Sequence, residues 1–236
     1  MTIRCCVPCL DEENLITPCV AALQEVFSDI TVIDLGSTDG TKSLLEDLDV
    51  SVDYYKDVTG PGFTKLKNKY CDEREWVFWV DGDEVWPKES LLALKRSWEH
   101  KKDIVDRFKV GWRDLVYSKE GNLYASSVHM IGPKLFKGKG ILGFRRAWPR
   151  EVVERKTPPV KGTRGCISDP SHWCWHGRGF KRSSVPALHR NKKQLDFFGS
   201  VREKRYAFEL LDSLPFEANE VALKRGRNLV PDRQFK

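Results

Sequence analysis

Asp81 and Asp83, two carboxylates one residue apart, have the chemistry of a metal site. They follow the apolar run 76–80 (Trp-Val-Phe-Trp-Val), which is typical of a buried strand and fixes where the next turn faces. Gly82 allows a tight bend that aims both carboxylates outward. Their hard oxygens suit Mg²⁺ or Mn²⁺, and such an ion would bridge diphosphate oxygens and neutralise a leaving nucleotide. The alternative is a solvated acidic turn, because an Asp-x-Asp pair alone is common.

Two other polar clusters also follow apolar, strand-like runs. The first is 11–14 (Asp-Glu-Glu-Asn), and the second is 36–41 (Gly-Ser-Thr-Asp-Gly-Thr). Ligands of parallel α/β sheets bind beyond the carboxyl ends of the strands, so three segments point into one crevice. The segment 36–41 has two interpretations: a strand-to-helix turn capped by Thr38 or Asp39, or a small-residue loop whose backbone a nucleotide approaches.

The elements that position these clusters alternate in the first half of the chain. Strands are predicted at 2–7, 30–35, 50–55 and 76–80, with helices ending near 27 and spanning 41–48 and 63–71. This alternation predicts an α/β fold with a mainly parallel sheet flanked by helices. The second half has a different pattern. A helix begins at Pro87, a half-exposed strand surrounds residues 108–112, and from Pro186 the chain is basic and helical in pattern.

Composition sets broad limits on the class of protein. The chain has 236 residues and a net charge of +6, which suits one buried core and is compatible with an anionic partner. It has no apolar stretch of the ~20 residues that cross a bilayer, and its start does not resemble a secretory signal, so we expect a cytoplasmic protein. In that compartment the seven scattered cysteines are expected to be reduced thiols.

Four segments resemble family 2 glycosyltransferases. Residues 7–14 are similar to their V-P-x-x-N-E-E-x-N opening, and 32–41 resemble V-V-D-x-G-S-T-D-G-T. Lys67-Asn68 looks like their Arg-Asn pair, and 79–84 resemble the L-D-A-D-E segment that carries the DXD-type metal site. Within the family, the chain is most similar to lipopolysaccharide core transferases with a D-A-D-E motif. The segments keep the family's order and cover about the first 90 residues. The resemblance implies the GT-A fold, with a C-terminal helical extension in this chain.

The same resemblance assigns roles to residues of the first half. Those expected to bind the nucleotide sugar are Pro8, Asp11, Glu13, Asp34, Ser37, Asp39, Lys67, Asn68, Asp81 and Gly82. Asp34 would lie by the base, Asp81 would face the ribose or diphosphate, and Asp83 would coordinate the metal with Asp81. The chain departs from the family at Leu35, where a second Asp is usual, and at Asp11, which replaces Asn. The nucleotide therefore stays open between UDP and GDP.

The second half supplies a general base by a weaker match. Residues 148–152 fall where the family often shows V-H-E, with Arg150 in place of the His, and Glu151 is the expected base. An inverting transferase needs a carboxylate to deprotonate the acceptor hydroxyl. Glu84 is the second candidate base, and the alternative for Glu151 is a surface carboxylate among basic neighbours.

A histidine of the segment 172–179 completes the expected site. His172 or His176 would join the metal shell, with His172 favoured, and Arg178 would contact the diphosphate. The alternative is that these histidines are structural. Trp173 and Trp175 stack on a sugar or belong to the core.

Together with these residues, the resemblance implies a metal-dependent transfer of a sugar from a UDP- or GDP-linked donor to a saccharide or glycan hydroxyl, and the inverting outcome is implied by the resemblance alone. The catalytic domain is predicted to span 1–180, with a donor half at 1–86 and an acceptor half at 87–180. Residues 181–236 form the basic helical extension, interpreted as a solvated face or as a peripheral contact with an anionic membrane.

Three alternatives remain at this point. A sugar-nucleotide pyrophosphorylase needs a Gly-rich, basic loop after its first strand, whereas 11–13 are acidic. A nucleic-acid-binding protein leaves the clustered carboxylates unexplained, so no nucleic-acid partner is expected. A degenerate transferase that binds nucleotide without turnover is compatible with Leu35 and Arg150.

Overall fold

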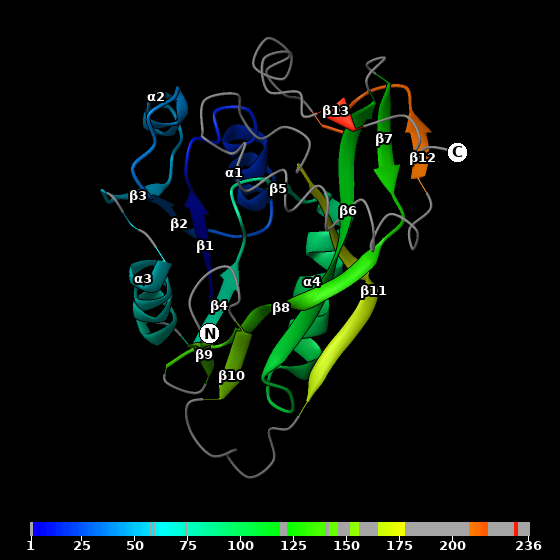
Figure 1. Cartoon of the computed structure of the whole chain (residues 1–236). Helices are drawn as coiled ribbons and strands as arrows, with labels where there is room; N and C mark the ends of the chain where they lie inside the picture. The colour runs from blue at the N-terminus through cyan, green and yellow to red at the C-terminus, as the bar shows by residue number, and fades with distance from the viewer. Residues whose placement is uncertain are drawn as a thin grey trace.

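The computed structural model describes residues 2–56, 58, 60–73, 75–118, 122–139, 142–145, 152–155, 165–177, 208–216 and 229–230. Within these residues one sheet of eleven strands forms the centre, and its main path runs β12-β7-β6-β8-β4-β1-β2-β3. In Figure 1 the blue strands β1 to β3 lie on one side, and the green and yellow strands β6, β7 and β11 lie on the other. The strands β4 and β8 join the two sides.

The first half of the chain forms the parallel part of the sheet, as predicted. Its strands are β1 (Ile3–Cys9), β2 (Asp29–Asp34), β3 (Ser51–Tyr54) and β4 (Trp76–Trp79). Its helices are α1 (Ile16–Gln24), α2 (Thr41–Glu46) and α3 (Gly60–Glu73). β1 pairs in parallel with β2 and β4, which brings the carboxyl ends of these strands to one edge. The three polar clusters therefore meet at that edge.

The second half adds antiparallel strands and one long helix. They are β5 (Glu84–Val85), α4 (Lys88–Lys101), β6 (Arg107–Ser118), β7 (Leu123–Ser126), β8 (His129–Lys137), β9 (Leu142–Arg145), β10 (Val152–Arg155) and β11 (Cys166–His176). β8 pairs antiparallel with both β4 and β6. β11 runs parallel to β6 and antiparallel to β5. Strands from both predicted halves thus share one sheet.

The expected C-terminal helices are wrong at the residues of 181–236 that the structure describes. β12 (Phe208–Leu211) pairs antiparallel with β7, and β13 (Leu229–Val230) pairs in parallel with β6. The open backbone edges of β6 and β7 offer hydrogen bonds that local helix propensity does not anticipate.

The core fills both faces of the sheet around β4. Trp76 and Phe78 belong to the cluster that includes residues of α1 and α4, whereas Val77 and Trp79 belong to the cluster that includes residues of α3. All four side chains are buried, which explains why this strand is apolar throughout. All seven cysteines are free thiols, and only Cys166 is exposed.

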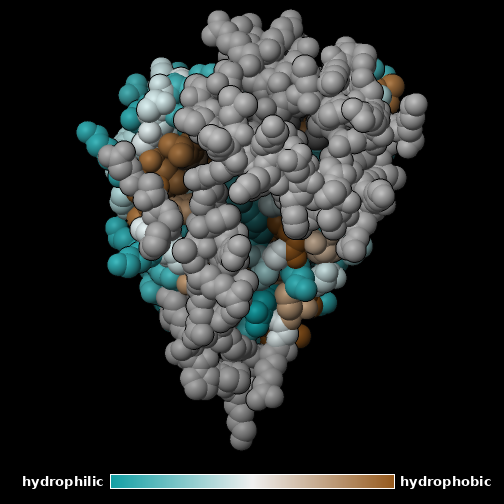
Figure 2. All heavy atoms as spheres, viewed as in Figure 1, coloured by the Kyte–Doolittle hydropathy of each residue, from teal (hydrophilic) through white to brown (hydrophobic). Residues whose placement is uncertain are grey.

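Where the described residues are visible in Figure 2, hydrophilic and hydrophobic areas are both present, and hydrophilic colour lies along the left edge of the view. The exposed large hydrophobic side chains among the described residues are Leu10, Tyr54, Ile104, Val128, Met130 and Leu210. No helix in the described part of the chain is long and apolar enough to cross a membrane.

Candidate functional site

The turn after β4 carries the predicted metal-binding carboxylates and is held against β1. Gly82 N donates a hydrogen bond to Pro8 O at 3.0 Å, and Glu84 N donates to Asp81 O at 2.9 Å. A Cβ on Gly82 would lie 2.9 Å from Cys9 Cβ. Close approach of two backbones therefore requires glycine here, and this contact fixes the turn that presents Asp81 and Asp83.

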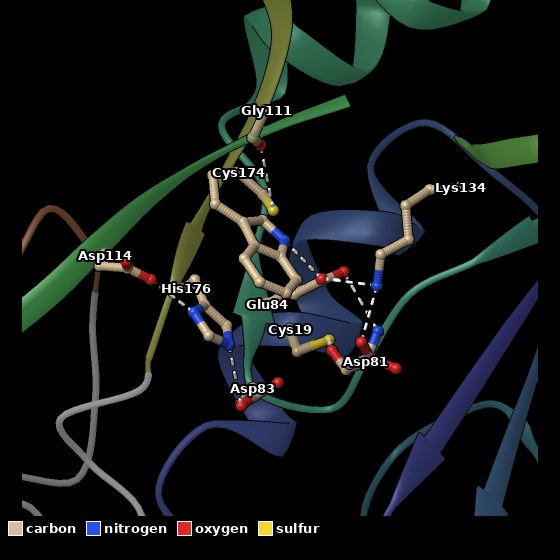
Figure 3. Close-up of polar contacts among 10 residues, drawn as sticks. Cys19, Asp81, Asp83, Glu84, Gly111, Asp114, Lys134, Cys174 and His176 are labelled. Carbon is tan, nitrogen blue, oxygen red and sulfur yellow. Dashed lines mark hydrogen bonds and ion pairs between the residues drawn. The ribbon is translucent and has the colours of Figure 1, made fainter. Parts of the chain in front are cut away.

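Asp83 faces a histidine at the end of β11 (Figure 3). His176 Nε2 lies 3.4 Å from Asp83 Oδ2, and His176 Nδ1 lies 2.6 Å from Asp114 Oδ1. Strand pairing fixes the position of His176 between these two carboxylates, since His176 is opposite Glu84 in β5 and Asp114 in β6. Burial lowers the pKa of His176, but the carboxylates of Asp83 and Asp114 outweigh it and raise the pKa to about 9.

Asp81 and Glu84 share one lysine ammonium. Lys134 Nζ, from β8, lies 2.7 Å from Asp81 Oδ2 and 2.7 Å from Glu84 Oε1. Glu84 Oε1 also accepts a hydrogen bond from Trp112 Nε1 at 2.7 Å, and Glu84 Oε2 accepts one from Asp81 N at 3.1 Å. Burial raises the pKa of Glu84 to about 7 although Lys134 opposes the shift. The pKa of Asp81 is lowered because Lys134 and Lys67 outweigh the effect of burial.

Trp112 joins these two groups of charges. Its indole ring stacks on the His176 imidazole with ring centroids 4.1 Å apart and planes 10° apart, while its N–H binds Glu84. The ring of His129 also lies edge-on to Trp112, at 6.3 Å. The result is a cluster of alternating charge, mostly buried apart from Asp81, whose side chain is 38% exposed. We call it the acidic cluster: Asp81, Asp83, Glu84, Asp114, Lys134 and His176.

The acidic cluster has the donors for a divalent ion. In the described residues no group of three or more His, Cys, Asp or Glu side chains is arranged to hold a metal. Asp83 Oδ2 and His176 Nε2, 3.4 Å apart, are nonetheless spaced nearly as two neighbouring donors on one octahedral ion, about 3.0 Å for bonds of about 2.1 Å. An ion that takes one or two carboxylates and completes its shell with phosphate oxygens and water therefore fits these residues.

Comparison with known proteins decides the family. The family described as "Glycosyl transferase family 2" matches residues 5–147. The chain belongs to this family. The predicted GT-A fold class agrees with that membership and with the mixed sheet, and family membership favours neither the pyrophosphorylase nor the nucleic-acid-binding alternative.

Individual relatives of this family 2 member are distant. The chain is 26% identical over 149 residues to the SPbeta prophage-derived glycosyltransferase SunS of Bacillus subtilis, covering 58% of this chain and 33% of SunS. It thus spans about a third of the curated relative. S. aureus TarS 1-349 has 14% identity, a TM-score of 0.47 and coverage of 87% and 74% of the two chains. Glucosyl-3-phosphoglycerate synthase from Mycobacterium tuberculosis, solved with Mn²⁺, UDP and phosphoglyceric acid, has 18% identity, a TM-score of 0.39 and coverage of 47% and 43%.

The predicted nucleotide-contacting acids of this family 2 chain bind the chain's own loops. Asp11 Oδ1 accepts hydrogen bonds from the backbone and hydroxyl of Thr38, and Asp34 accepts from the backbone N–H of Ser37 at 3.2 Å. Glu13 Oε2 accepts from Gly40 N at 2.9 Å, and Asp39 Oδ2 from Glu13 N at 3.3 Å. Ser37 Oγ accepts from Asp11 N at 2.8 Å. Asp11, Glu13, Ser37 and Asp39 thus fasten the loops after β1 and β2 together, and Asp34 holds the loop that follows its own strand.

Lys67 and Asn68, the pair on α3, take different roles. Lys67 is 5% exposed, and its ammonium lies 4.5 to 5.2 Å from the ring centroids of Phe63, Trp79 and Phe144. Asn68 exchanges two 2.8 Å hydrogen bonds with the backbone of Phe144. Asn68 therefore anchors β9, whereas Lys67 brings positive charge beside Asp81.

His172, the histidine favoured from the sequence, lies away from the acidic cluster. It is four residues before His176 on β11, about 13 Å along an extended strand. Its side chain is fully buried, with Nε2 3.0 Å from Ser97 Oγ of α4, and burial lowers its pKa. The structure thus places His176, and not His172, beside Asp83. Trp175 belongs to the third core cluster and Trp173 packs against it, which favours the core interpretation for both.

Two predicted residues, Glu151 and Arg178, lie outside the described residues. Glu84, the second candidate base, has no exposed surface and both its oxygens are engaged, which removes it from contact with an acceptor. Sequence reasoning missed Trp112, Asp114, His129 and Lys134 as site residues. The available signal was two polar or aromatic residues on each of β6 and β8, and it becomes informative only when the pairing of β6, β8 and β11 is known.

Proposed function

We propose that this protein transfers a sugar from a nucleotide-sugar donor to a saccharide or glycan hydroxyl, with a divalent ion held by Asp83 and His176. The observation that carries the proposal is the 3.4 Å approach of these two donors at the carboxyl edge of the sheet, in a family 2 glycosyltransferase. Switch-point crevices at this edge are where α/β sheets bind nucleotides.

The charges of the cluster suit a diphosphate. Mn²⁺ or Mg²⁺ bound there would supply the positive charge that stabilises the departing nucleoside diphosphate. Lys134 neutralises part of the charge of Asp81 and Glu84, so Asp83, beside His176, is the carboxylate proposed to hold the ion. Lys67 adds a second positive charge that lowers the pKa of Asp81.

Removal of the acceptor proton needs a separate carboxylate. Glu84 is buried and fully engaged, which supports Glu151 as the general base of an inverting reaction. Arg178 is proposed to contact the diphosphate. In this scheme the acidic cluster binds the donor, and the base and acceptor site come from the segments around Glu151.

The experiment is calorimetric titration of UDP and GDP into the protein, with Mn²⁺ and with EDTA. We expect one nucleotide to bind at least about tenfold tighter with Mn²⁺, and the gain to disappear in Asp83→Asn, which removes the charge at constant size. Asp103→Asn, at an exposed carboxylate after α4, is the matched control and should bind as the wild type does. Equal binding with and without Mn²⁺ in the wild type would overturn the metal site.

Turnover separates an active transferase from a degenerate one. Release of nucleoside diphosphate from UDP- and GDP-sugars is measured with and without a glycan acceptor mixture. Metal-dependent release identifies the donor. Metal-dependent nucleotide binding without release from any donor would favour the degenerate transferase.

A further inference from the structure

Asp114 is placed to orient His176. It lies on β6, directly opposite His176 in the parallel register of β6 and β11. Its Oδ1 is 2.6 Å from His176 Nδ1, shorter than the 3.4 Å between His176 Nε2 and Asp83 Oδ2. One imidazole is therefore bracketed by two carboxylates, and the tighter contact is with Asp114.

Asp114 is itself held from a third strand. Its backbone N–H donates to Ser126 Oγ of β7 at 2.8 Å, and its Oδ2 lies 3.8 Å from His129 Nε2 of β8. The ring plane of His176 is fixed separately, by stacking on Trp112. Both the rotation of the imidazole and the nitrogen that carries its hydrogen are thus determined by neighbours that do not face the ion.

We propose that Asp114 is a positioning residue that accepts the Nδ1–H of His176 and so directs Nε2 toward Asp83 and a bound divalent ion. The inference rests on the proposed function, since it assumes that Asp83 and His176 share an ion. A carboxylate behind a metal-binding imidazole selects the tautomer and orients the ring, and loss of such a partner weakens metal binding about 10- to 100-fold.

A purely structural role predicts something different. If Asp114 only joined β6 to β11, its removal would lower stability and leave the affinity for the ion unchanged in the folded protein. Asparagine at this position keeps an oxygen that accepts the Nδ1–H but loses the charge, whereas alanine removes both. The pair Asp114→Asn and Asp114→Ala therefore separates the effect of the charge from that of the hydrogen bond.

The test measures Mn²⁺ affinity by electron paramagnetic resonance with the nucleotide that binds, for wild type, both Asp114 variants, His176→Ala and the Asp103→Asn control. We expect Asp114→Ala to weaken Mn²⁺ binding about 10- to 100-fold and Asp114→Asn to weaken it less. A second readout needs no metal: the downfield proton NMR signal of the His176 Nδ1–H, expected in wild type and absent in Asp114→Ala. Circular dichroism checks that each variant is folded.

The outcomes are distinguishable. Wild-type Mn²⁺ affinity and an unchanged Nδ1–H signal in Asp114→Ala would overturn the role of Asp114 and leave the proposed function intact. Unchanged affinity in His176→Ala, with loss in Asp83→Asn, would overturn the inference by removing His176 from the ion. Absence of Mn²⁺ binding in the wild type with either nucleotide would overturn both the inference and the metal-dependent function.

Discussion

Replacing Lys134 by methionine should destabilise the protein far more than loss of an ion pair of the same length at the surface. The Lys134 side chain is 11% exposed, and its ammonium lies 2.7 Å from both Asp81 and Glu84, the second of which is completely buried. Methionine keeps much of the side-chain volume but leaves the Glu84 carboxylate buried without its cation. Breaking a buried pair in this way costs about 3–5 kcal/mol.

The assay is equilibrium unfolding in urea at pH 8 with EDTA. For a denaturant dependence of about 3 kcal/mol per molar, the midpoint should fall by about 1–1.7 M. The control is Lys88→Met, which breaks a 2.8 Å pair with Glu25 whose side chains are 56% and 48% exposed. An exposed pair contributes at most about 1 kcal/mol, so the control midpoint should move little.

The pH dependence gives the prediction a second, signed component. The pKa of Glu84 is about 7 in the folded wild type, because burial raises it more than Lys134 lowers it. Without Lys134 this pKa rises further, so at pH 5.5 the carboxyl of the folded variant is protonated and its charge no longer needs a partner. A carboxyl whose pKa is higher in the folded state adds stability as pH falls. The deficit of Lys134→Met should therefore narrow between pH 8 and pH 5.5.

A loss of less than about 1 kcal/mol in the free energy of unfolding of Lys134→Met at pH 8 would refute this prediction. The same loss of stability at both pH values would refute it as well. A double variant, Lys134→Met with Glu84→Gln, provides an internal check. Glutamine removes the buried charge, so the double variant should be more stable at pH 8 than Lys134→Met alone.

Three further predictions follow from the same structure. His176 has a pKa of about 9 in the folded protein against a usual 6.5, so without metal its protonated form stabilises the fold fully below pH 6.5, and this stabilisation is lost as pH rises through 9. Urea unfolding should show that the stability of the wild type relative to His176→Gln falls by about 3 kcal/mol over that range. Gly82→Ala places a Cβ 2.9 Å from Cys9 Cβ, and calorimetry should show metal-dependent nucleotide binding weakened at least about tenfold because the turn must move. Asp11 has a left-handed φ of 53° and accepts hydrogen bonds from Thr38. Thermal unfolding should show Asp11→Ala less stable than the wild type by about 2–4 kcal/mol, and Asp11→Asn less stable by under half of that. Equal losses of stability in the two variants would contradict this prediction.

The sequence predicts the parallel half of the fold well because its signals are local. The run 76–80 is apolar on both faces of a strand, and the polar turn that follows it is visible without any tertiary information. The parallel α/β sheet and the place of Asp81 and Asp83 at the strand edge come from such signals, whereas the GT-A fold class is what the resemblance to family 2 glycosyltransferases implies.

The remaining residues depend on long-range pairing. His172 and His176 lie on the same face of β11, so the period of a strand gives no reason to choose between them; only the position of β5 and Asp83 along that strand does. Lys134 lies in a Gly- and Lys-rich stretch that gives little sign of a strand, yet β8 pairs between β4 and β6. Glu84 has the residue type of a base, but burial and three hydrogen-bonding partners remove it from that role.

The parallel pairing of β6 with β11 has a consequence for how the protein folds and opens. Residues 107 and 166 begin this pair, so the contact closes a loop of about 60 residues and is expected to form late, after the local hairpins. His176 lies on β11, whereas Asp83 follows β4 in the first half of the chain, whose contacts are closer in sequence. An ion that joins them ties β11 to the first half of the chain. Amide hydrogens of β11 should then exchange with solvent more slowly when the ion is bound, and those of β1 should change little.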